Sequence, residues 1–483
     1  MAGKMMQFVS VEQRMPEKRG VADRADDFRE IYDRFAPERA AEQASRCEQC
    51  GIPFCQIHCP LQNNIPDWLR MTAEGRLEEA YELSSATNNM PEVCGRICPQ
   101  DRLCEGNCVI EKGFNSVTIG AVEKHITDTA WEKGWVKPVR PLRELGQSVG
   151  IIGAGPAGLA AAEQLRKEGY QVHVYDRYDR VGGLLIYGIP GFKLEKEIVE
   201  RRAALLAEGG VQFHLGCDIG GAGPSFEELR QRHGALLIAT GVYKARDIQL
   251  PGAGLGGIVP ALSYLTASNR SGLGDRVPDF ESGLLDARER RVVVIGGGDT
   301  AMDCVRTAVR QGAKSVQCLY RRDRTNMPGS MREVQHAEEE GVEFVWLSAP
   351  EAFLGDERVE AVRAVRMRLG TPDASGRQVP EPVPGSSMRL EADLVIKALG
   401  FDPEDMPAMF GQEELKVSRW GTVGIDWSTM MTSMPGVFAA GDIVRGASLV
   451  VWGIRDGRDA ADGIHRYLAG QAAGVRQKLA MAS

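Results

Sequence analysis

Eight of the eleven cysteines lie in two short segments, and clustered thiols are side chains that can bind a redox metal. The first segment is RCEQCGIPFCQIHCP, residues 46–60, and the second is PEVCGRICPQDRLCEGNCVI, residues 91–110. A reducing cytosol keeps such thiols free, and a chain of 483 residues can build its cores without disulfides. The grouping therefore indicates metal binding by Cys47, Cys50, Cys55 and Cys59 in the first segment and by Cys94, Cys98, Cys104 and Cys108 in the second.

The spacing of these cysteines favours iron–sulfur clusters over zinc. Structural zinc sites favour paired C-x2-C knuckles, and of the eight cysteines only Cys47 and Cys50 have that spacing. Bacterial ferredoxin motifs end in C-x3-C-P, with the last cysteine binding the other cluster, and Cys55, Cys59 and Pro60 repeat this ending. We expect two [4Fe-4S] clusters, one held by Cys47, Cys50, Cys55 and Cys108, the other by Cys59, Cys98, Cys104 and a fourth ligand.

A glycine-rich dinucleotide fingerprint begins at Ser148, in SVGIIGAGPAGLAAAEQLRKEGYQVHVYD. An apolar strand leads into Gly153-x-Gly155-x-x-Gly158, an Ala- and Leu-rich helix follows, and a second strand ends at Asp176. The glycines permit the tight turn, the close approach of a pyrophosphate, and the packing of helix on strand. Asp176 is placed to accept hydrogen bonds from a ribose.

A second fingerprint follows in RRVVVIGGGDTAMDCVRTAVRQGAKSVQCLYRRDR, with Gly296, Gly298 and Ala301 in its three positions. Its second strand ends in Arg321 and Arg322, where the first copy has an aspartate. Guanidinium groups bind phosphate in bidentate fashion, whereas a carboxylate repels it. The second site is therefore expected to prefer NADPH over NADH, the alternative being a solvated basic turn.

Two further segments resemble those of flavoproteins with two dinucleotide domains. In MPGVFAAGDIVRGASLVVWGIRDGRDAA a short strand runs into Gly441 and Asp442, and a helix begins near Ser448. In that class the aspartate contacts the ribityl and phosphate region of the flavin. LLIATG, ending at Gly241, and LVIKALGF, around Gly400, resemble the segments that cross between the two domains. The resemblance implies FAD in the first fold and the nicotinamide in the second.

Several function classes are disfavoured. Disulfide reductases of this architecture need a cysteine pair near the flavin, and Cys304 and Cys318 are too far apart for a C-x-x-C motif. No order of serine, histidine and aspartate suggests hydrolysis. The net charge of −8 gives no general attraction to nucleic acid or anionic lipid. Without an apolar leader, the chain is expected to be cytoplasmic and away from membranes.

Nearly the whole chain resembles the small (beta) subunit family of NADPH-dependent glutamate synthase. The likeness covers ERAAEQASRCEQCGIPFCQIHCPLQNNIPDWL, GGLLIYGIPGFKL with Gly183, GGGDTAMDC with Asp299 and Thr300, and AAGDIVRGASLVVWGIRDGR. It implies that electrons from NADPH pass through FAD and the clusters to the FMN of a large (alpha) subunit, which makes L-glutamate from L-glutamine and 2-oxoglutarate. A hetero-oligomer is expected.

Two other functions stay open. The same module occurs in ferredoxin-NADP transhydrogenase flavoproteins, which differ in their partner. A zinc-stabilised nucleotide-binding regulator would be colourless and would not turn over. For an oxidoreductase, catalysis is hydride transfer between bound cofactors, so no catalytic acid, base or nucleophile is expected.

The fourth ligand of the second cluster has two candidates. In related modules a non-cysteine ligand comes from the helix after the last cysteine, and the matching position in SVTIGAVEKH is Glu123. Cysteine counting gives the place to Cys94 instead, which ranks first because thiolate is the better ligand for iron–sulfur clusters.

The expected fold is α/β, with two Rossmann-like dinucleotide-binding domains, the second inserted in the first, after an α-helical iron–sulfur domain. Residues 1–145 are expected to form the helical domain with its two clusters. Residues 146–285 and 401–483 are expected to form the FAD domain, and residues 286–400 the NADPH domain.

Overall fold

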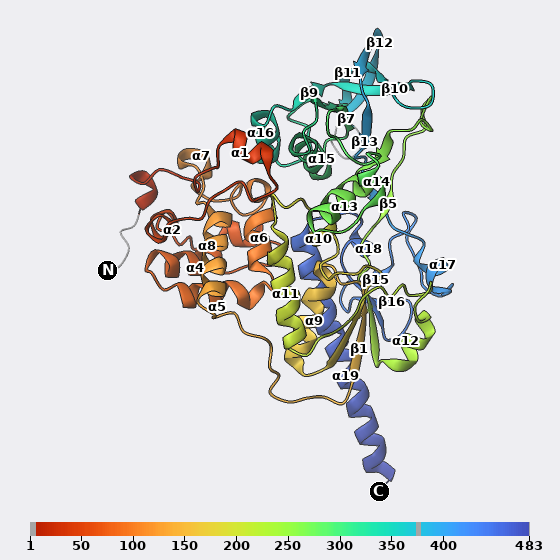
Figure 1. The fold of residues 1–483 in the computed structure, drawn as a ribbon. Coiled ribbons are helices and arrows are strands. Elements are labelled where there is room, and N and C mark those ends of the chain that lie inside the picture. Colours follow the sequence, from red (N-terminus) through yellow and green to blue (C-terminus); the bar gives the residue numbers. More distant parts are fainter. Residues whose placement is uncertain (1–5, 373–377, 483) are drawn as a thin grey trace.

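A computed structural model describes residues 6–372 and 378–482, in which a helical domain is followed by two α/β domains (Figure 1). The helical domain contains two short 3-10 helices, η1 (Gln7–Val9) and η2 (Gln100–Arg102). Its α-helices are α1 (Val21–Asp26), α2 (Pro37–Ala44), α3 (Phe54–Ile57), α4 (Ile65–Ala73), α5 (Leu77–Thr87), α6 (Pro91–Ile97), α7 (Glu111–Phe114) and α8 (Ile119–Glu132).

Local sequence explains where three of these helices begin. Proline stands in the first turn of α2, α4 and α6, where its missing N–H costs nothing and its fixed φ suits the helix start. The buried side chains of Trp68, Val122 and Ile126 join α4 and α8 in one core. The helices thereby hold the loops between them, where most of the clustered cysteines lie.

The first α/β domain is built on a seven-stranded sheet of order β15-β16-β17-β4-β1-β2-β3. β1 (Ser148–Ile152) lies between β4 (Ala235–Ile238) and β2 (Gln171–Tyr175), so the chain reverses its direction of travel across the sheet at β1. Ligands of such folds bind at the carboxyl ends of the strands at this switch point. The remaining strands are β3 (Gln212–His214), β15 (Ile425–Asp426), β16 (Met431–Thr432) and β17 (Val437–Ala439).

Helices α9 (Pro156–Glu168) and α19 (Val450–Ala482) pack against each other beside this sheet, and the end of α19 extends beyond it (Figure 1). None of the helices in the described part of the chain has the length and apolar character required to cross a bilayer. The other helices of this domain are α10 (Leu184–Tyr187), α11 (Lys196–Glu208), α12 (Phe226–Arg232), α17 (Met406–Phe410) and α18 (Asp442–Arg445).

The second α/β domain has a five-stranded parallel sheet of order β6-β13-β7-β8-β9. Its strands are β6 (Ile258–Pro260), β7 (Arg291–Ile295), β8 (Ser315–Tyr320), β9 (Glu343–Trp346) and β13 (Leu394–Lys397), and its helices are α13 (Ala261–Gly272), α14 (Pro278–Glu281), α15 (Asp299–Arg310) and α16 (Met331–Glu339). A three-stranded antiparallel sheet extends from it, formed by β10 (Ser348–Leu354), β11 (Ala361–Pro372) and β12 (Gln378–Glu391).

The sheet topology moves one expected domain boundary. The expectation placed residues up to 285 in the first α/β domain, but β6 pairs with β13 and α13 packs on α15, so both belong to the second domain. The chain passes between the domains through a two-stranded ribbon of β5 (Lys244–Ala245) and β14 (Phe401–Asp402). The sequence misleads here because β6 has only three residues and the polar α13 reads as a surface loop.

Candidate functional site

The structure brings the clustered thiols together around two cavities in the helical domain. Residues 47–55 and residue 108 meet at the first cavity. The loop before α4 and the loop after α6 meet at the second cavity. The first cavity is lined by Cys47, Cys50, Cys55 and Cys108. The second is lined by Cys59, Cys94, Cys98, Cys104 and Glu123. We name these groups the first and second thiol sets.

The donor chemistry of both sets fits an iron–sulfur cluster. Burial raises the pKa of Cys47 to about 11 and that of Cys55 to about 12, and neighbouring thiols add to the effect. Burial likewise raises the pKa of Cys59 to about 11. Thiolates crowded in this way need a bound cation to ionise, and a cluster takes its ligands as thiolates. In residues 6–372 and 378–482 no three such side chains are spaced to hold a single metal ion.

Arg46 is a buried cation beside the first thiol set, and it was missed by sequence reasoning. Its side chain is fully buried and lines the first cavity. Its guanidinium donates hydrogen bonds to the carbonyls of Val11 at 3.0 Å and Phe114 at 2.6 Å. A fixed positive charge stabilises the negative charge that four thiolates bring. Its position directly before Cys47 is the only signal that the sequence offered.

Glu123 lies on the buried face of α8 and lines the second cavity. Its Oε1 accepts hydrogen bonds from Asn63 at 3.2 Å, Ser84 at 3.4 Å and Asn88 at 3.4 Å. Burial raises its pKa to about 8. The structure thus places both candidate fourth ligands, Cys94 and Glu123, at the same cavity.

The first fingerprint forms an open phosphate cradle at the start of α9. A Cβ on Gly158 would lie 2.0 Å from the carbonyl oxygen of Gly153, so only glycine permits this contact of helix and strand. At Gly155, the N-cap of α9, no atom lies within 4 Å of that position, which leaves the space a pyrophosphate needs. Gly183 and Gly441 come close to the same turn, next to Gly155 and Ala157 respectively.

Two carboxylates of the first domain, the buried Asp176 and the half-buried Asp442, lie close to strand ends. Asp176 accepts hydrogen bonds from the backbone N–H groups of Ala154 at 2.7 Å and Tyr178 at 2.8 Å, and it keeps acceptor capacity for a ribose. Burial raises the pKa of Asp442 to about 6, and the backbone of Ser448 opposes this by hydrogen bonding. Gly241 follows β4, and its φ of 71° is accessible to glycine.

The second fingerprint repeats the cradle at α15. A Cβ on Gly296 would lie 2.2 Å from the Ala398 carbonyl oxygen, whereas no atom lies within 4 Å of that position at Gly298. Asp299 and Thr300 begin the helix. The two arginines differ: Arg321 is exposed, but Arg322 is buried and its Nε donates to the Gln378 carbonyl at 3.0 Å.

A cavity of about 220 Å³ lies where the three domains meet. Cys98 lines it from the helical domain, Ile189 and Leu449 from the first α/β domain, and Asp299 and Thr300 from the second. The carboxyl-end loops of both dinucleotide folds therefore open into one space beside the second thiol set. This is the place where a nicotinamide, a flavin ring and a cluster can come close together.

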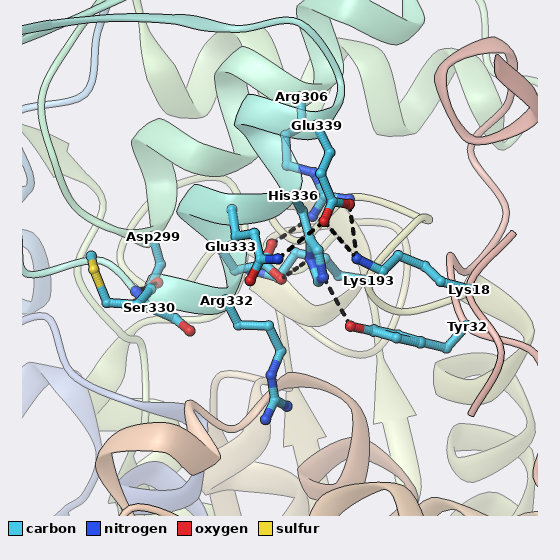
Figure 2. A network of polar contacts seen from close by, with 12 residues as sticks. Lys18, Tyr32, Lys193, Asp299, Arg306, Ser330, Arg332, Glu333, His336 and Glu339 are labelled. Atoms are coloured by element: carbon cyan, nitrogen blue, oxygen red, sulfur yellow. Dashed lines mark hydrogen bonds and ion pairs between the residues drawn. The ribbon is translucent and has the colours of Figure 1, made fainter. Parts of the chain in front are cut away.

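A polar network covers one side of this cavity (Figure 2). Lys193, from the segment after α10, contacts Asp303 of α15 with Nζ and Oδ1 2.9 Å apart. On α16, His336 hydrogen-bonds Glu333 at 3.3 Å and the Tyr32 hydroxyl at 2.9 Å. The network joins all three domains through side chains that the sequence analysis did not single out, since their pairing depends on contacts across hundreds of residues.

The loop from Cys98 to Glu105 also contacts the second α/β domain directly. Asp101 accepts a hydrogen bond from the Ser330 hydroxyl at 3.1 Å, and Arg332 pairs with Glu105 at 2.8 Å. The helical domain therefore holds the second α/β domain in place at the same loop that carries two thiols.

The fold and the site together define an oxidoreductase with two dinucleotide domains and a cysteine-rich iron–sulfur domain. Residues 24–135 match the family model described as dihydropyrimidine dehydrogenase domain II, 4Fe-4S cluster. Residues 147–457 match the model described as pyridine nucleotide-disulphide oxidoreductase. These matches imply FAD, NADP and an iron–sulfur centre, and they confirm the expected fold class.

Relatives over the full length give the particular family. The chain is 68% identical to the glutamate synthase [NADPH] small chain of Azospirillum brasilense, covering 97% of each chain. It is 44% identical to the Escherichia coli protein of that name, covering 97% of this chain and 100% of the relative. The chain belongs to the glutamate synthase (NADPH) small chain family, as its sequence resemblance predicted.

The fold is also similar to a solved structure. Mycobacterium tuberculosis FprA in complex with NADPH superposes with a TM-score of 0.58 at 20% identity, covering 70% of this chain and 86% of that one. At this identity the likeness concerns the fold alone.

Proposed function

We propose that this chain is the electron-input subunit of a glutamate synthase, taking electrons from NADPH and delivering them to a large (alpha) subunit that makes L-glutamate from L-glutamine and 2-oxoglutarate. The observation that carries the proposal is the cavity in which both dinucleotide folds and Cys98 meet. The names of the full-length relatives support the same function. Its eleven free cysteines suit a reducing cytoplasm.

The cofactor sites follow from the cradles and cavities. FAD, when bound, supplies the exchange between a hydride and single electrons. In our proposal the FAD site comprises Gly153, Gly155, Gly158, Asp176, Gly183, Gly241, Gly441, Asp442 and Ser448. The NADPH site comprises Gly296, Gly298, Asp299, Thr300, Arg321 and Arg322.

Two [4Fe-4S] clusters complete the proposal, one in each thiol set. Four sulfurs and Arg46 surround the first cavity. Cys59, Cys98 and Cys104 surround the second, together with both candidates for the fourth ligand, Cys94 and Glu123. The protein's own contribution is positional, because the walls of the shared cavity fix the distance between the groups that exchange electrons.

The test compares two activities on one preparation. The purified chain should oxidise NADPH with ferricyanide but make no glutamate, because in this proposal the glutamine and 2-oxoglutarate sites belong to the large chain. Adding the cognate large chain should restore glutamate formation. Efficient transfer to ferredoxin, with no response to the large chain, would instead identify a transhydrogenase, and stoichiometric zinc without iron would exclude the clusters.

A further inference from the structure

The cavities of the helical domain form a sequence that leads away from the nucleotide folds. Cys98 lines both the three-domain cavity and the cavity of the second thiol set. Ile119 lines both that cavity and the cavity of the first thiol set. The cavity of the first thiol set is therefore the last of the three. An electron that passes from cavity to cavity reaches the first thiol set last.

Exposed apolar side chains gather in the two segments that hold this last set. Ile52 and Phe54, which are 63% and 46% exposed, lie in the loop between Cys50 and Cys55. Ile57 is 55% exposed, and Val109, directly after Cys108, is 57% exposed. Scattered apolar residues are normal on a surface, but a group of large ones marks an interaction site. We call Ile52, Phe54, Ile57 and Val109 the apolar rim.

We propose that the apolar rim is the docking surface for the redox-active large subunit, a proposal that rests on the function proposed above. Oxidation of one NADPH to NADP⁺ and a proton gives two electrons, and each leaves singly to reduce the partner's centre. Electron transfer slows steeply with distance, so the partner's centre must approach the surface over the first thiol set.

The chemistry of the rim favours a stably bound subunit over a transient carrier. From Cys47 to Cys59 the only acidic or basic residue besides His58 is Glu48, so the loop offers little charge for electrostatic steering. Charge-steered encounters depend on complementary potentials. An apolar rim instead excludes water and suits the core of a lasting interface.

The double variant Ile52→Asp and Ile57→Asp tests this surface. Neither side chain lines the thiol cavity, so iron content and NADPH-driven ferricyanide reduction should match those of the parent. The Kd for the purified large chain should rise roughly thirtyfold or more, as expected for the loss of interface anchors. Trp420→Asp is the matched control, since Trp420 is 67% exposed in another domain, and its Kd should not change.

An unchanged Kd in the double variant, with iron retained, would overturn the docking surface alone. A parent chain that neither binds the large chain nor supports glutamate formation would overturn the proposed function. Hydrogen exchange on the parent complex gives an answer that does not depend on the variant folding. Amides of residues 50–59 and 108–114 should gain protection on binding, and their unchanged exchange would also contradict the proposal.

Discussion

At the scale of single residues, the two candidates for the fourth ligand of the second thiol set, Cys94 and Glu123, have different surroundings. Cys94 packs within the apolar core that the helical domain shares with α9, as a small buried residue does. Glu123 is a buried carboxylate held by amide and hydroxyl donors, with no ion-pair partner among the described residues. A bound iron would account for that burial, and we therefore propose Glu123 as the ligand, where cysteine counting favoured Cys94.

We therefore expect Glu123→Ala to lose or alter the spectroscopic signal of one cluster, while Cys94→Ala retains both clusters. Electron paramagnetic resonance of the reduced protein, with iron and sulfide analysis, makes the measurement. The reverse pattern, in which Cys94→Ala loses a cluster and Glu123→Ala does not, would assign the ligand to Cys94.

The two arginines after β8 have different surroundings, and so their substitutions should have different effects. Arg321→Ala should weaken NADPH relative to NADH by about 1.5–3 kcal/mol, the cost of a lost charge-assisted hydrogen bond. Arg322→Ala should weaken NADPH as well and should also lower thermal stability, because Arg322 connects this turn to β12 through the Gln378 carbonyl. The ratio of kcat/KM for the two coenzymes and the Tm of each variant separate these effects. An unchanged ratio in Arg321→Ala would place the 2′-phosphate elsewhere.

At the scale of elements, a substitution at the start of α15 can test coenzyme binding without disturbing the fold. Gly298 has an extended backbone, with φ of −89° and ψ of 177°, and open space where a Cβ would stand. Gly298→Ala should thus change the stability of the coenzyme-free protein by no more than about 0.5 kcal/mol. It should raise the KM for NADPH roughly tenfold, because the added methyl occupies the phosphate cradle.

Gly272→Ala is the control for that substitution, since it is equally open and lies at the end of α13 in the same domain. Its KM should match that of the parent. A Gly298→Ala protein with unchanged KM would show that the pyrophosphate does not rest on this turn.

A buried ionic contact between α15 and α16 predicts how stability depends on pH. Glu340, directly after α16, accepts hydrogen bonds from Arg306 and Arg310 of α15 at 2.7–2.9 Å. Burial opposes ionisation, but Arg310 and Arg306 lower the pKa of Glu340 to about 2. Burial also lowers the pKa of Arg310, yet a guanidinium stays protonated at any pH at which proteins fold.

Because the folded pKa lies below the ordinary value of 4.5, this carboxylate stabilises the fold fully above pH 4.5. The stabilisation falls as the pH drops from 4.5 towards 2. Glu340→Gln should cost about 3–5 kcal/mol at pH 7, since it leaves buried charges unpaired, and should flatten the acid limb of the stability profile. Urea unfolding at several pH values tests both. A parallel, unshifted acid limb would show that Glu340 is not the responsible group.

The features of this protein that could be predicted from sequence are those encoded by residues close together in the chain. The cradles at α9 and α15 follow from glycines a few residues apart, and the thiol segments from cysteine spacing, so both could be located in advance. β6 could not be assigned, because three residues carry no periodicity and their place depends on pairing with β13. Lys193 was missed for the same reason, since its partner Asp303 lies more than a hundred residues away.

At the scale of the whole molecule, hydride transfer and electron delivery depend on different domains. Cys50→Ala should remove or alter one cluster and abolish glutamate formation by the complex with the large chain. NADPH-driven reduction of the flavin should persist, because the residues that line the cavity of Cys50 all belong to the helical domain. Loss of part of the helical fold is the chief complication, since cluster binding contributes to folding.

Circular dichroism and FAD content therefore accompany the two activity measurements on the Cys50→Ala protein. A variant that assembles, lacks one cluster and still makes glutamate at the parent rate would show that the clusters are structural.

The contacts of Asp101 and Glu105 with Ser330 and Arg332 also bear on how this module can be recombined. The chain enters and leaves the second α/β domain through one narrow ribbon, at residues 244–245 and 401–402, which offers a convenient boundary for domain exchange. A domain grafted there from another flavoprotein would lack partners for the loop from Cys98 to Glu105. An exchange of coenzyme preference therefore has to include that loop. Chimeras that preserve electron delivery must carry the inserted domain and the loop from the same parent.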